Sequence, residues 1–541
     1  MSLAEYSGLD NLKFDNRFVQ QLPADSETDN YRRQVTNACY SKVLPSKVSA
    51  PKVIAYSREM AEQLGFTETD CHSKRFAEVF VGNEILAGMD PYAMCYGGHQ
   101  FGQWAGQLGD GRAINLGEVV NIEHQRWALQ LKGSGPTPYS RSADGLAVLR
   151  SSVREFLCSE AMHHLGVPTT RALSLILTGE QVVRDMFYDG NPKAEQGAVV
   201  CRVAPSFIRF GSFQVFASRG EIEVLRQFVD YTITTDFPHL LKSHPVLGKE
   251  LYLAWFEEVC RTTAEMIVHW QRVGFVHGVM NTDNMSIMGL TIDYGPYGWL
   301  DDYDPDWTPN TTDAGERRYR YGQQPQIALW NLVQLANAIY PLIEEVEPLQ
   351  QALTVYNQSF DQGWNAMMAS KLGLDVFNPE TDAELCTELF ALLAEVETDM
   401  TIFYRKLAQL DIEAKVDDMT DELLLITLQE AWYRLDALTE SYKLRLLQWL
   451  RKYILRLQSG GVKQADKIQI MNASNPKYVL RNYLSQQAID KAEQGDYAML
   501  NELLDVMRHP YDEQIDKDKY AVKRPEWARN KAGCSKLSCS S

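Results

Sequence analysis

Residues 277–295 read HGVMNTDNMSIMGLTIDYG, and this stretch decides the fold class. His277 and Asn284 lie seven positions apart, and Asp293-Tyr294-Gly295 begins nine residues after Asn284. The surrounding pattern, from Gly274 to Tyr294, predicts a short strand, a loop and a second strand. The polar side chains are therefore expected in the loop and at its exit.

This spacing is typical of protein kinases, whose catalytic loop reads H-R-D-x-x-x-x-N and is followed by D-F-G. Asn284 and Asp293 match the two metal ligands of that pattern, and both offer the oxygen atoms that Mg²⁺ and Mn²⁺ prefer. A kinase keeps its catalytic Asp two positions after the His, but here that position is Val279. Asp283 is the nearest carboxylate that could accept a proton from a hydroxyl group.

Three weaker signals precede the loop in the order that a kinase would have them. Gly109-Asp110-Gly111-Arg112 ends a glycine-dense stretch, which permits close approach of the backbone to a ligand. Lys132 ends an apolar strand, and Glu155 lies on the next predicted helix, Gly145–Leu165. Taken singly they are also explained by turns, by a lysine reaching the surface and by a solvated helix face. Their order before Asp293 favours the kinase-like interpretation.

The whole chain is expected to form an α+β, bilobal protein-kinase-like fold, with a strand-rich N-lobe, a helix-rich C-lobe and extra carboxy-terminal helices. Strands are predicted at Ala113–Val120, Trp127–Leu131, Val182–Tyr188 and Ala198–Val203, and helices from Glu221 to about Trp270 and from Gln326 to about Met507. The expected units are an extension packed on the core (1–90), the N-lobe (91–220), the C-lobe with both loops (221–345), a helical extension (346–510) and a polar tail (511–541).

Composition excludes several classes of partner. The formal net charge of −18 disfavours sequence-independent binding of nucleic acid or of anionic lipid. No apolar run approaches the roughly 20 residues that span a bilayer. Acidic residues within Met1–Phe18 disfavour a secretory or transit peptide, and nine scattered cysteines without a CxxC pair are typical of a reduced, cytoplasmic protein.

The chain resembles the selenoprotein O (YdiU) family of kinase-like protein adenylyltransferases. The resemblance runs from about Phe14 to the terminal Cys-Ser-Ser. It rests on YGGHQFG (96–102), LGDGRA (108–113), LKGSGPTPYSR (131–141), Asp144-Gly145, SFIRFGSF (206–213), HGVMNTDNM (277–285) and DYGPYG (293–298). It implies transfer of AMP from ATP to Ser, Thr or Tyr hydroxyls of proteins, with autoAMPylation as a further expectation. It also implies that ATP binds in a reversed orientation, with its α-phosphate toward the acceptor.

The resemblance also implies roles for individual residues. Asp283 would accept the proton, Lys132 would bind phosphate, and Glu155 would pair with Lys132. Mg²⁺ or Mn²⁺ would be held by Asn284 and Asp293. The residues implied to bind ATP are Gly109, Gly111, Arg112, Lys132, Asp144, Gly145, Arg202, Arg209 and Asp293.

Two alternatives and one departure stay open. Val279 is also compatible with a nucleotide-binding pseudokinase scaffold, and the motif order with a conventional protein or small-molecule kinase. Some family members end in a Cys–selenocysteine pair with two residues between, whereas Cys539 here lies five positions after Cys534. No cysteine occurs between Asp304 and Asp313, so a disulfide from the tail to that loop is excluded.

Overall fold

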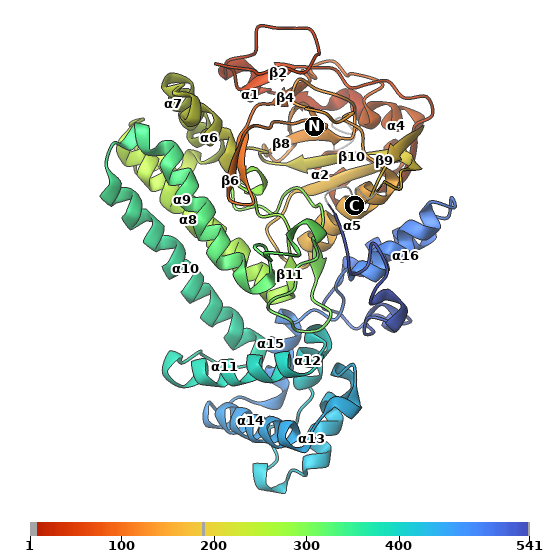
Figure 1. Ribbon diagram of the computed structural model, residues 1–541, viewed down its shortest axis with the longest axis vertical. Helices are drawn as coiled ribbons and strands as arrows, with labels where there is room; N and C mark the ends of the chain where they lie inside the picture. The colour runs from red at the N-terminus through yellow and green to blue at the C-terminus, as the bar shows by residue number, and fades with distance from the viewer. Residues whose placement is uncertain (1–7, 187–189, 539–541) are drawn as a thin grey trace.

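The computed structural model describes residues 8–186 and 190–538. The amino-terminal half builds an eight-stranded antiparallel sheet (Figure 1). Its strand order is β2-β4-β7-β8-β10-β9-β3, and β1 pairs with β7 beside this path. The strands are β1 Lys13–Phe14, β2 Tyr40–Lys42, β3 Lys52–Tyr56, β4 Tyr92–Met94, β7 Ala113–Val120, β8 Arg126–Lys132, β9 Arg171–Arg184 and β10 Lys193–Ala204. With the helices that follow, the chain is a mixed α/β protein.

The two faces of this sheet have different chemistry because side chains alternate along a strand. Leu129 and Leu131 of β8 pack in one apolar cluster with Phe76 and Phe80 of α4. Gln130, between the two leucines, is equally buried but faces polar partners on the opposite side of the sheet. The helices of the first hundred residues are α1 Arg17–Gln21, α2 Arg58–Gln63, α3 Glu68–Cys71 and α4 Lys74–Val81. One face of the sheet therefore packs on α4, and the other carries polar groups beside the apolar side chains that form a second core with the helix after β8.

Helix α5 (Leu149–His164) packs on β9 and β10, with α16 (Asn482–Ala492) and α17 (Ala498–Met507) against its other side. It begins four residues later than the sequence suggested. Leu146 and Val148 are extended and form isolated bridges with Ser134 and Gly197, so their backbone groups are used before the helix begins.

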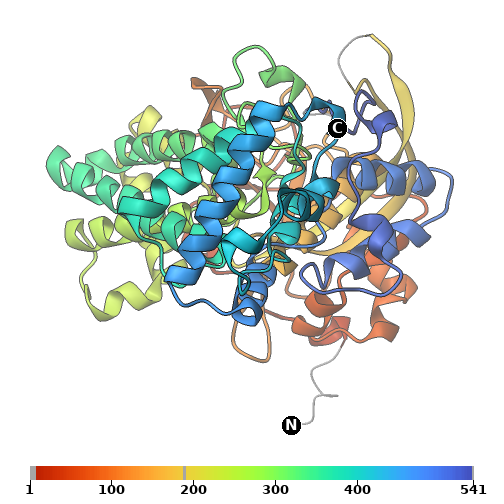
Figure 2. The same ribbon diagram turned by 90° about the horizontal axis from the view of Figure 1, so that it is seen from below.

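The remaining helices lie below and beside the sheet. The long helix α8 packs along α9 and α10 (Figures 1 and 2), and α11–α15 build a second apolar core at the far end of the molecule. No helix within the described residues is long and apolar enough to cross a membrane. The bounds are α6 Phe210–Arg219, α7 Ile222–Asp236, α8 Lys249–Val273, α9 Gln324–Ile343, α10 Val346–Leu372, α11 Pro379–Glu395, α12 Met400–Leu407, α13 Asp421–Leu428, α14 Glu440–Ser459 and α15 Gln464–Ser474.

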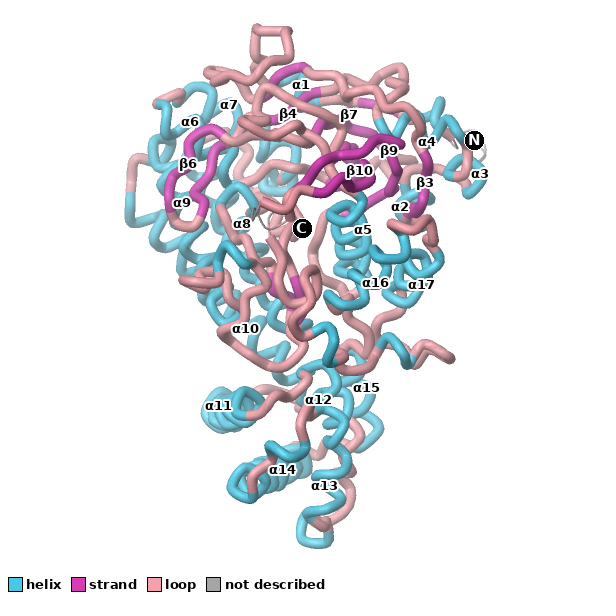
Figure 3. Tube along the Cα trace, turned by 45° about the vertical axis from the view of Figure 1, so that its right-hand side comes forward, coloured by secondary structure: helices cyan, strands magenta, loops and turns pink. Residues whose placement is uncertain are grey.

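Two small hairpins lie outside the main sheet, and the first of them lies beside α6 and α9 (Figure 3). The first pairs β5 (Gly97–Gln100) with β6 (Gln103–Gln107), and the second pairs β11 (Phe275–Val276) with β12 (Gly298–Trp299). The second strand of the expected strand–loop–strand unit was therefore placed too early, since it follows Asp293 instead of containing it. Asp293 has a φ of 57°, a left-handed conformation that a strand cannot contain.

Other differences from the sequence-based expectation also arise from pairing. Three strands from the first 90 residues, β1, β2 and β3, join the main sheet. The predicted strand Val182–Tyr188 corresponds only to the end of β9, which begins at Arg171 and pairs with both β3 and β10. Tyr188 itself lies outside the described residues.

The carboxy-terminal tail is attached near the loop that follows β12. Leu537 is fully buried, its N–H donates to the Pro309 carbonyl (3.0 Å), and its carbonyl accepts from the N–H of Thr311 (2.8 Å). Cys534 is buried with a free thiol, and Cys539 lies outside the described residues. The Leu537 carbonyl also accepts from Thr311 Oγ1 (2.9 Å), so the tail is held to the loop through the backbone of Leu537.

Candidate functional site

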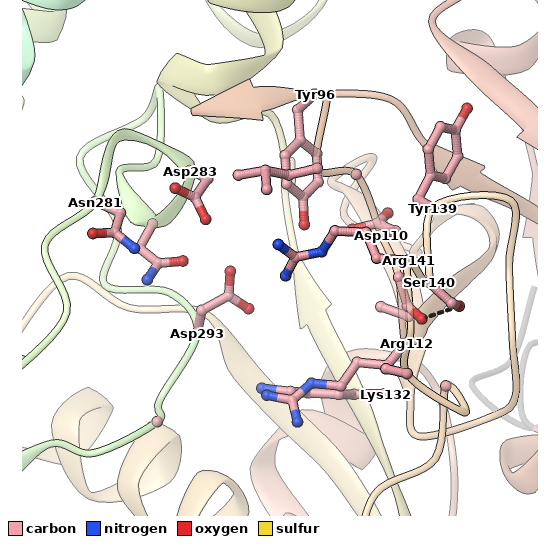
Figure 4. A pocket seen from close by; sticks show the side chains of 18 of the residues that line it. Tyr96, Asp110, Arg112, Lys132, Tyr139, Ser140, Arg141, Asn281, Asp283 and Asp293 are labelled. Atoms are coloured by element: carbon pink, nitrogen blue, oxygen red, sulfur yellow. Dashed lines mark hydrogen bonds between the residues drawn. The ribbon is translucent and has the colours of Figure 1, made fainter. Parts of the chain in front are cut away.

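A cavity of about 760 Å³ opens between the polar face of the sheet and the loop that precedes and follows Asp293. This volume is in the usual range for ligand pockets. In Figure 4, Asp283 and Asp293 enter from one side, and Lys132 and Arg112 from the other. The other residues that line it are Tyr96, Gln100, Phe101, Leu108–Gly111, Ala113, Tyr139–Leu146, Arg184, Arg202, Val279, Asn281, Asn284, Gly295 and Pro296.

A row of polar side chains crosses three strands behind the cavity. Asn115 of β7 and Arg202 of β10 are both in direct register with Gln130 of β8. Gln130 accepts a hydrogen bond from Arg202 through its Oε1 and donates through its Nε2 to Asn115 Oδ1 (3.2 Å). The same amide nitrogen lies 3.3 Å from Asp110 Oδ2. All these groups are buried, so the sheet holds the Arg202 guanidinium in one fixed position.

Glu155 links two cations at the inner wall. Its Oε2 lies 2.5 Å from Lys132 Nζ, the ion pair expected from the sequence, and its Oε1 lies 3.2 Å from Arg202 Nη1. Burial lowers the pKa of Lys132 to about 8, although Glu155 opposes this change, and Arg112 and Arg202 add to it. An anion bound here would favour the charged form of Lys132.

Asp293 is held by two arginines. Its Oδ1 accepts from Arg202 and its Oδ2 from Arg209. Burial alone would raise the pKa of Asp293, but Arg209 and Arg202 outweigh that effect and hold the pKa well below its usual range. Arg209 also packs over the ring of Tyr96, 4.5 Å from the ring centroid. The Asp293 carboxylate is therefore ionised and fixed in orientation. The two ion pairs also help to hold the residue in its left-handed backbone conformation.

His277 braces the loop and does not reach the cavity. Its Nε2 lies 2.8 Å from the Ile292 carbonyl, and its Nδ1 accepts from the N–H of Val279 (3.3 Å). Burial lowers its pKa, in keeping with a neutral ring that donates at one nitrogen and accepts at the other. The ring thus joins the start of the loop to the residue before Asp293.

Asp283 and Asn284 lie in the short 3₁₀ turn Thr282–Asn284. Burial raises the pKa of Asp283 to about 6, while a hydrogen bond from Gln100 opposes the rise. Asn284 donates from Nδ2 to the Val279 carbonyl (2.9 Å), which leaves its Oδ1 as the amide atom suited to a cation. A carboxylate that titrates near neutral pH is suited to accept a proton.

The glycines of the predicted phosphate loop serve packing between two loops. At Gly109 (φ 86°) an added Cβ would lie 2.4 Å from the Tyr139 ring, and at Gly111 it would lie 2.8 Å from the Tyr139 carbonyl. Asp144, near the cavity mouth, forms a two-pronged ion pair with Arg184 at 2.7 and 2.8 Å. Arg112 lines the cavity, and within the described residues its side chain makes no hydrogen bond or ion pair.

The side chains fit a divalent cation only if a ligand supplies further oxygens. No three His, Cys, Asp or Glu side chains gather as a ready cation site within residues 8–186 and 190–538. Asn284 and Asp293 provide two oxygen donors at the same wall of the cavity. Mg²⁺ is commonly held by one or two protein groups together with phosphates and water, so this pair is compatible with a metal–nucleotide complex.

Most of the predicted residues come together. Ten line the cavity, and Glu155 and Arg209 lie directly behind it. Arg209 does not line the cavity itself, but it contacts Asp293, which does. The residues missed from the sequence are Gln100, Asp110, Asn115 and Gln130. Alternation in the strand that ends at Lys132 could have identified Gln130, but not its partners.

Comparison with known proteins agrees with this geometry. The family described as "Protein adenylyltransferase SelO" matches residues 26–508. A "Protein nucleotidyltransferase YdiU" of Rhodopirellula baltica is 61% identical over 537 residues, covering 98% of this chain and 99% of the relative. A protein of the same name from Aromatoleum aromaticum is 59% identical over 535 residues, covering 98% of this chain and 100% of the relative. Another, from Nitrosospira multiformis, is 53% identical over 558 residues, covering 100% of this chain and 98% of the relative. A match this long and this similar leaves one conclusion, that the chain belongs to the SelO family.

Proposed function

We propose that this protein transfers AMP from ATP to hydroxyl groups of Ser, Thr or Tyr side chains in proteins. The observation that carries the proposal is the cationic inner wall of the cavity. Lys132 and Arg202 are buried there, whereas residues 141–144 at the mouth are exposed. A triphosphate would gain from the inner cations, which can bind its charged oxygens in addition to Glu155 and Asp293, whereas an uncharged purine ring would gain nothing from them. ATP would thus enter with its phosphates first and its nucleoside toward the mouth.

The proposed reaction has one bond made and one broken. The acceptor oxygen attacks the α-phosphorus, the bond from that phosphorus to the oxygen bridging to the β-phosphate breaks, and pyrophosphate leaves. Asp283 takes the hydroxyl proton, and its pKa of about 6 means that it is mostly ionised at neutral pH. Lys132, Arg202 and Arg112 would stabilise the negative charge on the phosphates.

Asn284 and Asp293 would hold Mg²⁺ or Mn²⁺. When bound, the cation supplies positive charge to the phosphate oxygens. Asp293 can contribute only if Arg202 and Arg209 release it, and both guanidiniums would then be available to phosphate. Contact of Arg209 with phosphate stays a prediction that depends on this exchange.

The kinase-like, two-lobed organisation is part of the same proposal. Residues 91–220, with α5, Lys132 and Glu155, would be the N-lobe, to whose sheet residues 1–90 add strands β1, β2 and β3. Residues 221–345 would be the C-lobe with both loops. Residues 1–90, 346–510 and 511–541 would be the extension, the helical addition and the tail. The cytoplasmic location and autoAMPylation stay predictions.

The test uses ATP labelled at the α- or at the γ-phosphorus, incubated with the protein and Mg²⁺ or Mn²⁺ together with a mixture of candidate proteins. We expect covalent label from α-³²P-ATP and none from γ-³²P-ATP. Label from the γ-position alone would mean a conventional kinase. Nucleotide binding with no transfer of either label would mean a pseudokinase scaffold.

A further inference from the structure

The β5–β6 hairpin reaches from the sheet to the loop that carries Asp283, although about 180 residues separate them in sequence. Two alternate N–H groups of the hairpin bond to this loop. His99 donates to Thr282 Oγ1 (2.7 Å), and Phe101 donates to Asn281 Oδ1 (3.2 Å). The hairpin is thereby fixed against the residues immediately before Asp283.

The Gln100 side chain and the Gly98 backbone meet the Asp283 carboxyl group. Gly98 and Gln100 are two apart in β5, so both face the same side of the strand. Gln100 Nε2 donates to Asp283 Oδ2 at 3.1 Å. Asp283 Oδ1 is buried without a hydrogen-bond partner within the described part of the chain. One oxygen is therefore bound by the hairpin, and the other is enclosed by it.

Gly98 provides the space for this arrangement. An added Cβ would lie 2.5 Å from Asp283 Oδ1 and 2.9 Å from Asp283 Cβ. Gly98 is absent from the glycines with positive φ, so its backbone conformation does not require glycine. The absence of a side chain is instead what allows the carboxyl group to lie against β5.

We propose that Gln100 is a positioning residue, which holds Asp283 Oδ2 toward the acceptor hydroxyl while Gly98 lets Oδ1 turn away. This inference rests on the proposed function only in assigning Asp283 as the proton acceptor. Gln100 does not take part in proton transfer itself. It orients the carboxylate and stabilises its ionised form through a charge-assisted hydrogen bond.

The test is the pH dependence of kcat/KM for transfer from ATP, in the wild type and in Gln100→Ala. The wild type should show an acid limb, to which ionisation of Asp283 contributes, and an alkaline limb, to which loss of the Lys132 proton contributes. Loss of the hydrogen bond should move the acid limb up by about one pH unit, hence about a fivefold loss at the midpoint of the wild-type acid limb, and leave the alkaline limb unchanged. Gln100→Glu, which replaces the donor by a charge, should move it further. An unshifted acid limb in both variants would overturn the proposal.

Gln103→Ala is the matched control, because Gln103 pairs with Gln100 across the hairpin and its side chain is exposed. It should leave both limbs in place. Should the wild type transfer γ-label instead, the proposed function fails, but the same profile for phosphate transfer still tests Gln100.

A measurement of stability tests the contact without any activity. A double-mutant cycle of Gln100→Ala with Asp283→Asn is followed by the midpoint of thermal unfolding at pH 7.5 and at pH 4.5. We expect coupling between the two residues that is larger at pH 7.5, where Asp283 is ionised. Additive effects at both pH values would contradict the proposal.

Discussion

Replacing Asp283 by Asn should make the protein more stable at neutral pH and nearly inactive. Burial shifts the pKa of this carboxyl from 3.8 to about 6, so the folded state opposes its ionisation. At about 1.36 kcal/mol per pKa unit, this shift changes the free energy of unfolding by about 3 kcal/mol between low and neutral pH. The raised pKa stabilises the wild type fully below pH 3.8, and this stabilisation is lost as pH rises through 6. Asn carries no charge and does not incur this loss.

The difference in free energy of unfolding between Asp283→Asn and wild type should therefore depend on pH in a defined way. The difference should not vary with pH below about pH 4. It should grow in favour of the variant between about pH 4 and pH 6, and it should stay constant above about pH 6. Transfer should fall about 10²–10⁴-fold, the usual contribution of a general base, with nucleotide affinity little changed.

Urea denaturation at a series of pH values, followed by tryptophan fluorescence, measures this difference. Asp417→Asn, at an exposed position outside the cavity, is the control and should show no such trend. A stability difference that does not vary between pH 4 and 7 would refute the assigned burial of the charge. Near wild-type transfer by Asp283→Asn, with metal present, would refute the assigned role and favour a carboxylate that only braces the loop around Asn284.

Three further predictions concern the cations and their partners. Asp293→Ala should abolish transfer and cost about 3–5 kcal/mol of stability, because it leaves Arg209 buried without a carboxylate and Arg202 with Glu155 alone. Circular dichroism should show a retained fold, and full activity would contradict the metal site. Affinity for a non-hydrolysable ATP analogue, measured by calorimetry, should weaken above about pH 8 because Lys132 loses its proton there. Constant affinity from about pH 7 to 9 would argue against a contact between Lys132 and phosphate. Removal of divalent cations by EDTA should abolish transfer, and Mg²⁺ or Mn²⁺ should restore it; transfer in EDTA would exclude Asn284 and Asp293 as obligatory ligands.

Local spacing was sufficient for much of the candidate site. The interval from His277 to Asn284 and on to Asp293 predicted a loop with its polar groups at the cavity, where Asp283, Asn284 and Asp293 do lie. The apolar run that ends at Lys132 predicted β8, and the helical periodicity beyond Gln326 predicted the chain of helices. These features depend on residues that are close to one another in the sequence, so the order of the residues is enough to predict them.

Pairings between distant segments could not be predicted in this way. The register that aligns Asn115 and Gln130 with Arg202 is set by hydrogen bonds between strands, and a shift of one residue would turn Arg202 into the apolar core. The ion pairs of Asp293 with Arg202 and Arg209 join residues 91 and 84 positions apart.

What the sequence by itself determined is therefore the set of reactive groups and the local elements that carry them. Only the tertiary structure decided the pKa values of those groups and the direction in which their side chains point. Burial, which raises the pKa of Asp283 and lowers that of Lys132, depends on every segment packed around them. The contact of Gln100 with Asp283 exists because the hairpin folds back onto the loop, and nothing in either segment alone specifies that meeting.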